Sequence, residues 1–564
     1  MKRLILSTIP DDFDPERDLP LGPFCFIGKE HVYAGWENVD FLPDPFLNME
    51  VILEAEKVTV SYIKNLIRPL TDELNTKNVT GYSEKFWQII ILPYVFVLIH
   101  AVFERQARLF QFIEKYKNEP IFVELLPGNM SWEFSDTSEF MHLGILNPAY
   151  NHWLFSRILE ENIPERWEAV YIKVPATGGG TIIDKAYRKQ KLKQTLIDKI
   201  QYNRCGLIGG ISLAETFLWS AYLNFKPVSN ASRSSEDVYQ HIKTNDVLRT
   251  DIKNILLKSM PVCFKYLNLL NIPSVKPKPG KLRLVGTSLY YNDNLKYFYA
   301  KCVEGGERLV CTQHGGGGCG FKILPWRADI EYKHHAYLSW GWDKQEDYPG
   351  NIRPVSSPLL TRFQNKHSQR TETLLMVGTA VYSYSFRLSS EPQAVQGIDY
   401  RKEKVSFIEN LNMDIFKEMS YRPYMNENGA LADRSYIEKQ FPGITICDGH
   451  FHREMLSCKL LIVDHPGTTL WMALAANVPT ISFWNEHHWT MSRQAAPHFD
   501  AMKEAGMFCE SGKAAADKVN ELWEDITGWW SGSDTQMIRK DFCYHHARSN
   551  RLWRWEWLKT LWKL

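Results

Sequence analysis

The hydrophobic pattern of residues 459–484 is typical of one repeating unit of an α/β sheet. The run KLLIVD, 459–464, is a short apolar stretch of the kind that forms a strand buried on both faces. Pro466 and Gly467 interrupt it as a loop, and LWMALAAN then predicts about two turns of helix. The run VPTISFW, 478–484, predicts the next strand. Since parallel strands need a crossover connection, this segment predicts a strand–helix–strand unit.

The same alternation extends over the rest of the second half of the chain. Apolar runs at 373–379 and 444–449 have strand character, and helical patterns separate them. In the first half, the runs at 281–290 and 308–313 also have strand character. Such alternation predicts a parallel sheet covered by helices on both faces, and therefore the α/β class.

A polar segment at 351–370, containing proline and several serines, predicts a linker between two α/β domains. We expect an N-terminal α/β domain with helical insertions over 1–350 and a C-terminal α/β domain over 371–530. Helices over 531–564 complete the chain. Ligands of open parallel sheets bind at strand carboxyl ends, so we expect a site between the two domains.

Two apolar segments raise the question of a membrane. Residues 86–103 approach the length of a membrane span, but they include Gln88, Pro93 and His100, so we expect a buried helix. The segment 551–564 mixes tryptophan with lysine and arginine. That pattern is typical both of an interfacial helix and of a helix packed against the rest of the protein.

Composition excludes several classes of function. The 564 residues include 66 Lys and Arg against 65 Asp and Glu, a balance that predicts no nucleic-acid partner. The ten cysteines contain no C-x-x-C pair, so neither a zinc framework nor a dense disulfide scaffold is expected. Reduced thiols fit a cytoplasmic protein.

A glycine-rich loop directly after a predicted strand is the first candidate site. Five glycines occupy the eight positions 313–320. Glycine lets the backbone approach a ligand closely and adopt positive φ. His314 is therefore a candidate catalytic residue beside a donor-binding loop of Gly315, Gly316 and Gly317. The alternative is a flexible loop with a structural histidine, because the spacing matches no established phosphate-binding motif.

Arg422 and Tyr424 form a second candidate set, and Thr379 ends the first strand of the C-terminal domain. A guanidinium holds a phosphate or a carboxylate through two hydrogen bonds, as lysine cannot. The alternative is a surface arginine beside a turn.

The third candidate set surrounds the helix that is predicted to begin near residue 468. It consists of Asp464, His465, Gly467, Thr468 and Thr469. The set places hydroxyls and backbone N–H groups at that helix start, an arrangement that suits a phosphate. The alternative is ordinary helix capping by threonine.

Three pairs of adjacent histidines, at 334–335, 487–488 and 545–546, do not predict a metal site. Neighbouring side chains diverge on a strand and point about 100° apart on a helix, whereas metal ligands must converge. We expect neither a metal nor a cofactor.

These stretches together resemble a bacterial family of transferases from surface-polysaccharide gene clusters, those of O-antigen and lipopolysaccharide. The resemblance covers nearly the whole chain and rests on blocks that include RLILSTIP, QHGGGGCGF, YLSWGW, LLMVGT, YRPY, ALAANVPTISFWNEHHW and AAPHFDAMKEAGMF. It implies a GT-B-type glycosyltransferase, in which two Rossmann-like domains face each other. The C-terminal domain of that type binds a nucleotide-sugar donor, the N-terminal domain binds the acceptor, and a last helix crosses back.

The resemblance also implies a donor. Transferases of CMP-linked acidic sugars, such as Kdo or a nonulosonate, carry a basic motif and a paired Ser/Thr motif about 45 residues later, and Arg422 and Thr468–Thr469 are similarly placed. Met472 departs from the family, which has an acidic residue there. The acceptor hydroxyl needs a base, for which His314 and Asp136 are available.

We therefore expect a cytoplasmic enzyme that acts on a glycan or lipid-linked glycan acceptor, with at most peripheral contact with the inner membrane. Two alternatives stay open: a CDP-polyol phosphotransferase of the same fold, and a non-catalytic protein that binds a nucleotide or carbohydrate.

Overall fold

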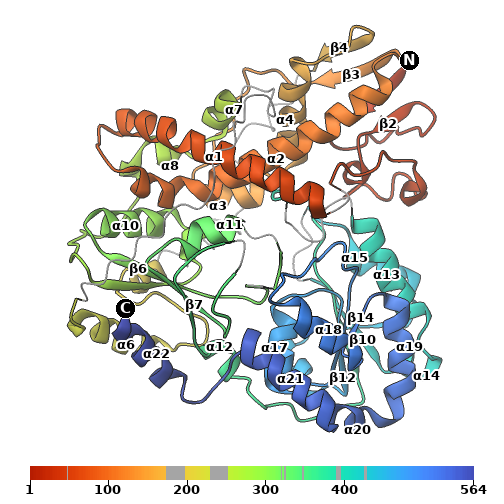
Figure 1. Cartoon of the computed structure of the whole chain (residues 1–564). Helices are drawn as coiled ribbons and strands as arrows, with labels where there is room; N and C mark the ends of the chain where they lie inside the picture. Colours follow the sequence, from red (N-terminus) through yellow and green to blue (C-terminus); the bar gives the residue numbers. More distant parts are fainter. Residues whose placement is uncertain are drawn as a thin grey trace.

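Three separate parallel β-sheets organise the part of the chain that the computed structural model describes (Figure 1). The structure describes residues 1–564 except 47–48, 173–196, 229–251, 319, 323–324, 346–347, 389–395 and 425–428. In Figure 1 the N-terminal sheet lies at the top, the middle sheet at the lower left and the C-terminal sheet at the lower right. The α/β class with parallel sheets is confirmed, but the region 1–350 holds most of two sheets that the sequence pattern did not separate.

The N-terminal sheet has the strand order β2-β1-β3-β4 and is parallel throughout. Its strands are β1 (Lys2–Ile5), β2 (Asp18–Pro20), β3 (Ile121–Leu125) and β4 (Trp167–Tyr171). The helices of this region are α1 (Met49–Asn78), α2 (Glu84–Tyr116), α3 (Thr137–Glu139), α4 (Pro148–Glu160), α7 (Ile252–Ser259) and α8 (Val262–Lys265).

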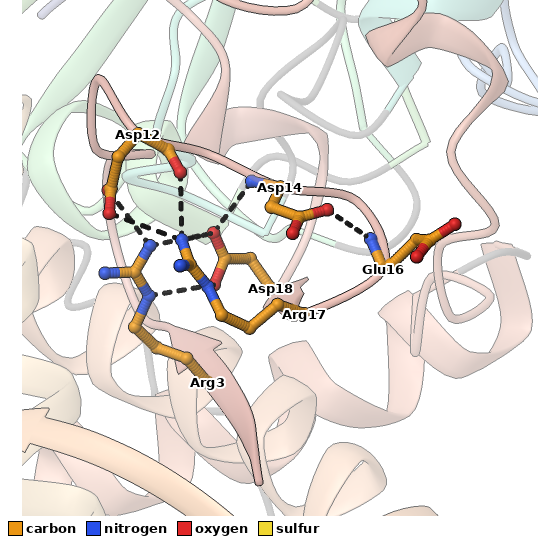
Figure 2. A network of polar contacts seen from close by, with 6 residues as sticks. All are labelled: Arg3, Asp12, Asp14, Glu16, Arg17 and Asp18. Carbon is orange, nitrogen blue, oxygen red and sulfur yellow. Dashed lines mark hydrogen bonds and ion pairs between the residues drawn. The ribbon is translucent and has the colours of Figure 1, made fainter.

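An ion-pair network joins the first two strands (Figure 2). Asp18 at the start of β2 is buried, and its carboxylate accepts two hydrogen bonds of 2.8 Å from Arg3 on β1. Arg17 donates two more, at 3.0 and 3.1 Å. Bidentate pairs of this kind fix geometry as well as charge, so the network holds the loop before β2 against β1.

The long apolar helix α2 is part of the core. It is long and apolar enough to cross a membrane, yet 83% of its most apolar 18-residue window is buried inside the protein. Its N-cap is Ser83, whose hydroxyl accepts from the backbone N–H of Phe86, as expected for a helix start. The burial agrees with the predicted buried helix.

The middle sheet runs in sequence order, β5 (Leu282–Val285), β6 (Arg308–Thr312), β7 (Ala336–Ser339) and β8 (Ile352–Pro354). The helices of this region are α6 (Leu213–Phe225), α9 (Ser288–Tyr291), α10 (Asp293–Glu304), α11 (Pro325–Arg327) and α22 (Trp553–Lys563). Trp553, Trp557 and Leu561 of α22 join one buried cluster with Trp219 of α6 and Leu284 of β5. The last helix therefore packs on the middle sheet.

The predicted linker 351–370 is not a plain linker in the structure. β8 pairs with β7 in parallel register and α12 (Pro358–Thr361) follows it. Val355, Ser356 and Ser357 between them are buried. Proline is tolerated at the end of an edge strand, which explains why a polar, proline-containing segment can still complete a sheet.

The C-terminal sheet has the strand order β11-β10-β9-β12-β13-β14, and every pair is parallel. Numbered within the sheet, this is the Rossmann order 3-2-1-4-5-6, in which ligands bind where the order reverses. That point lies between β9 (Leu374–Val377) and β12 (Leu460–Val463). The other strands are β10 (Met419–Arg422), β11 (Thr445–Ile446), β13 (Thr480–Phe483) and β14 (Phe508–Cys509).

Helices of the C-terminal region are α13 (Gly397–Glu409), α14 (Met413–Lys417), α15 (Asp433–Gln440), α16 (Phe451–Ser457), α17 (Thr468–Ala476), α18 (Ala496–Glu504), α19 (Gly512–Leu522), α20 (Ile526–Ser531) and α21 (Ser533–His546). The predicted unit at 459–484 is present as β12, α17 and β13. This prediction is confirmed.

Candidate functional site

The glycine loop of the middle sheet touches the start of α17 in the C-terminal region. The backbone N–H of Gly316 donates to Thr468 Oγ1 at 2.9 Å, joining residues 152 positions apart. A Cβ at position 316 would lie 2.8 Å from Trp471 Cε3 and 3.0 Å from Thr468 Cα, closer than real Cβ atoms pack. Glycine is therefore required here by the close approach of the loop to the first turn of α17. The structure therefore brings together two of the candidate sets that were predicted separately.

The start of α17 carries no side-chain cap among the residues that the structure describes. Gly467 is the N-cap residue, and Thr468 and Thr469 are the first helical residues, both half-buried. The hydroxyl of Thr468 accepts from the glycine loop rather than from its own helix. The alternative of ordinary capping by threonine is wrong. The first N–H groups of a helix carry partial positive charge, so this helix start can receive an anion.

Gln313 shapes the glycine loop, although the sequence analysis did not single it out. Its amide nitrogen donates to Gly315 O at 2.9 Å. Its amide oxygen accepts from Trp340 N at 2.7 Å and from Trp342 Nε1 at 2.8 Å. Both tryptophans belong to YLSWGW, one of the blocks that carry the family resemblance. No other feature of the sequence singled out residues 337–342. Gly317 adopts φ of +74°, a left-handed conformation that favours glycine.

His314 pairs with a buried glutamate that no sequence pattern indicated. Its Nε2 lies 3.1 Å from Glu331 Oε1, and the Glu331 side chain is fully buried. Because an ionised carboxylate only accepts, a neutral imidazole in this pair carries its hydrogen on Nε2 and its lone pair on Nδ1. The ring of Tyr290 packs edge-on to the imidazole, with centroids 5.7 Å apart. A histidine oriented in this way is equipped to accept a proton.

Asp464 lies at the carboxyl end of β12, where the strand order reverses, but it is only 1% exposed. Its carboxylate accepts from Tyr400 Oη at 2.6 Å and from His465 Nδ1 at 2.9 Å. Burial raises the pKa of Asp464, but the nearby charge of Lys404 and the bond from His465 lower it below its ordinary value. Asp464 is therefore an ionised anchor that orients its neighbours. A direct role for it in donor binding stays a prediction.

His465, a member of the third candidate set, is the neighbour that Asp464 orients. With Nδ1 held by Asp464, its Nε2 faces Gly467, where a Cβ would lie only 2.5 Å away. The ring therefore lies beside the start of α17. Because Nδ1–H donates to Asp464, the neutral ring presents the lone pair of Nε2, a hydrogen-bond acceptor, at this helix start.

Beneath these loops lies a buried network that begins at Thr379. The backbone N–H of Thr379 donates to Tyr400 Oη at 2.9 Å. Lys404 Nζ, also fully buried, lies 2.5 Å from Asp433 Oδ2 and donates to Tyr421 Oη at 2.8 Å. Thr379 thus lies close to the point where the strand order reverses, between β9 and β12, and its contacts are with this network. A role for it in donor binding stays a prediction.

The contacts of Arg422 are with the loop after β11 rather than with the start of α17. Arg422 Nη1 donates to Gly449 O at 2.8 Å and to Cys447 O at 3.3 Å, and its guanidinium lies over the ring of Phe451. Tyr424 is 47% exposed. The structure therefore uses the arginine to hold the loop after β11, and a role in donor binding stays a prediction.

Asp136 serves as the N-cap of α3. Its carboxylate accepts from the backbone N–H of Glu139 at 2.8 Å. The next residue, Thr137, is held by Asp293, whose Oδ2 accepts from the Thr137 N–H at 2.6 Å. The contact gives Asp136 a structural role at the start of α3. Its role as a base therefore stays a prediction.

Parallel sheets, a Rossmann strand order and an uncapped helix start beside an oriented histidine define an α/β protein with a candidate anion-binding site. The chain belongs to the LIC12162 family of transferases, whose profile matches residues 2–561. No curated protein matches the chain.

Two solved structures show partial likeness. The spinosyn forosaminyltransferase SpnP matches with a TM-score of 0.26 and 10% identity, over 46% of this chain and 71% of that one. A single-substitution variant of the wall teichoic acid polymerase TagF matches with a TM-score of 0.27 and 11% identity, over 48% of this chain and 75% of that one. Likenesses this low carry no argument about activity.

Proposed function

We propose that this transferase moves a glycosyl group from a nucleotide-activated donor to a surface-polysaccharide acceptor, which is a glycan or a lipid-linked glycan. The observation that carries the proposal is the Gly316–Thr468 contact. It joins a loop bearing a candidate base to a helix start suited to a phosphate. In this proposal residues 371–530 bind the donor, residues 1–350 bind the acceptor, and the reaction takes place in the cytoplasm.

The donor phosphate is assigned to the start of α17. The N–H groups of Thr468 and Thr469 and the Thr469 hydroxyl supply donors there. Donors fixed by the fold stabilise the charge that develops on a leaving phosphate without having to reorganise. For the donor itself we propose a CMP-linked acidic sugar, on the spacing between Arg422 and the two threonines.

His314 is assigned as the base of an inverting transfer. Its Nδ1 takes the proton of the acceptor hydroxyl while that oxygen forms the new bond to the anomeric carbon. The bond from that carbon to the donor phosphate breaks, and the nucleotide leaves with both electrons of that bond. Glu331 holds the imidazole by Nε2 and stabilises the imidazolium that forms.

The first test is thermal stabilisation by CMP, CDP, UDP, GDP and dTDP, each with and without magnesium. A ligand that binds only the folded state raises the denaturation midpoint according to its affinity. Stabilisation by CMP alone supports the acidic-sugar donor, whereas stabilisation by another nucleotide discards that donor and keeps the transferase. No stabilisation by any nucleotide would contradict the phosphate site.

Variants then test the assigned residues. We expect His314→Ala and Thr469→Ala to lose turnover while folding normally, and the exposed control His487→Ala to keep it. Full activity in both site variants would refute the assignment. Analysis of the product distinguishes a glycosidic bond from the phosphodiester that a CDP-polyol phosphotransferase would form.

A further inference from the structure

Two histidines and an aspartate from two helices converge on the surface of the C-terminal region. His498 lies in the first turn of α18, and Asp541 and His545 lie on α21. His498 Nδ1 is 2.9 Å from Asp541 Oδ2, and His545 Nδ1 is 3.4 Å from Asp541 Oδ1. One ligand atom from each residue can be chosen so that all three lie within 4.8 Å of one another. Residues four apart share a helix face, and α18 brings the third side chain to that face.

The two nitrogen–oxygen separations, which end on different oxygens of Asp541, are near those between neighbouring ligands of a tetrahedral transition-metal ion. Imidazole nitrogen and carboxylate oxygen bind Zn²⁺ at about 2.0–2.2 Å, so neighbouring ligand atoms lie roughly 3.3–3.6 Å apart. An ion here would replace the protons that the imidazoles direct to the carboxylate. His545 Nδ1 also lies 3.0 Å from the backbone oxygen of Asp541, so this ring must turn from the helix carbonyl toward the ion.

Packing against neighbouring rings fixes the orientation of His498 before any ion binds, while the three side chains stay accessible to solvent. The ring of His498 packs edge-on against His546 with centroids 4.7 Å apart, and Phe542 packs against His546 at 5.2 Å. The side chains of His498, Asp541 and His545 are 20%, 55% and 43% exposed. A dissolved ion can therefore reach ligands that are already close together.

The geometry points to a site for one divalent transition-metal ion, formed by His498, Asp541 and His545 and completed by water. Two imidazoles favour Zn²⁺, Co²⁺, Ni²⁺ or Cu²⁺ over Mg²⁺ and Ca²⁺, which prefer oxygen ligands. The ion would tie α18 to α21. Beyond α21, Arg548 N–H donates to Trp340 O of the middle sheet at 3.0 Å, so the ion would also support the crossing between the two sheets. This site is independent of the proposed transfer.

The test uses the full chain, stripped of metal with a chelator and then titrated with Zn²⁺ by calorimetry and with Co²⁺ by absorption spectroscopy. We expect one ion per chain, the visible bands of four-coordinate Co²⁺, and a higher denaturation midpoint with Zn²⁺. Asp541→Asn and the double variant His498→Ala/His545→Ala should bind at least about 100-fold more weakly, beyond the roughly 10–100-fold cost of losing a supporting group.

The matched control is His487→Ala/His488→Ala, which also removes two histidines and should bind like the unmodified chain. Asp541 is more than half exposed, so Asp541→Asn is expected to fold and keeps the test decisive even if the histidine variant does not. Absence of Co²⁺ bands at one equivalent would overturn the proposal. So would Zn²⁺ binding that Asp541→Asn leaves unchanged or that the control weakens equally.

Discussion

Lys404 holds together the network beneath the candidate site, and its removal should destabilise the C-terminal region strongly. The side chain is fully buried between Asp433, at 2.5 Å, and Asp464, at 3.5 Å. In Lys404→Met both carboxylates stay buried without their cation. Breaking a buried ion pair by removing one partner costs about 3–5 kcal/mol of unfolding free energy, because an uncompensated charge is left inside.

That cost can be converted into a thermal shift. For a unit of 150–250 residues, 1 kcal/mol corresponds to about 2–4 °C in denaturation midpoint, so Lys404→Met should lower the midpoint by roughly 6–20 °C. Thermal denaturation followed by tryptophan fluorescence measures this. Adding Asp433→Asn to Lys404→Met should recover part of the loss, because it removes one of the two buried charges.

The control is the same substitution in an exposed pair of the same region. Lys417 lies 2.8 Å from Asp414, but the two side chains are 66% and 92% exposed. Exposed pairs contribute little because solvent and salt screen them, so Lys417→Met should change the midpoint little. If Lys404→Met lowers the midpoint no more than Lys417→Met does, the network is not the support we infer.

Three further predictions follow from the packing and the charges. Burial raises the pKa of Asp18, but bonds from Arg3 and Arg17 lower it to a net value of about 2, against an ordinary 3.8. The ionised carboxylate therefore stabilises the fold above pH 4, and about 2 kcal/mol of that stabilisation is lost as the pH falls toward 2. In acid titrations the free energy of unfolding should decline less steeply for Asp18→Asn than for the unmodified chain. An equal slope would contradict this. Gly316→Ala should lower the free energy of unfolding by about 1–3 kcal/mol and weaken nucleotide binding, both measured by thermal shift. Gly81→Ala, at a position where a Cβ meets nothing within 4 Å, should change neither. Trp557→Ala, at a buried position, should lower unfolding free energy in urea by about 3–5 kcal/mol, and a loss below about 1 kcal/mol would contradict its place in the core.

Local pattern predicted the elements better than their grouping into sheets. The unit at 459–484 was predictable because apolar runs, loop residues and helix formers follow one another within a few residues. The separation of the N-terminal and middle sheets was not, because it depends on which distant strands pair. The segment 351–370 was predicted as a linker, and the edge strand β8 and the short helix α12 within it were not foreseen, since composition does not distinguish a short edge strand from a polar loop.

The site shows the same division. Glycines and threonines indicate their backbone roles locally, and His314 follows a strand, so these could be named from the sequence. Glu331 lies in the short helical turn Ala328–Tyr332 with no distinguishing pattern, and its partnership with His314 exists only after folding. The catalytic and donor-binding roles themselves stay predictions.

The docking of α22 on the middle sheet has a consequence for how the chain folds during synthesis. The last strand of that sheet ends at Pro354, and α22 begins at Trp553, about 200 residues later. Ribosomes add about 5–20 residues per second, so the apolar face that α22 covers stays exposed for roughly 10–40 s before α22 is synthesised. Throughout that interval the nascent chain presents Leu284 and Trp219 without their tryptophan cover. A chaperone that shields this face should therefore matter more for the yield of folded protein than for its final stability.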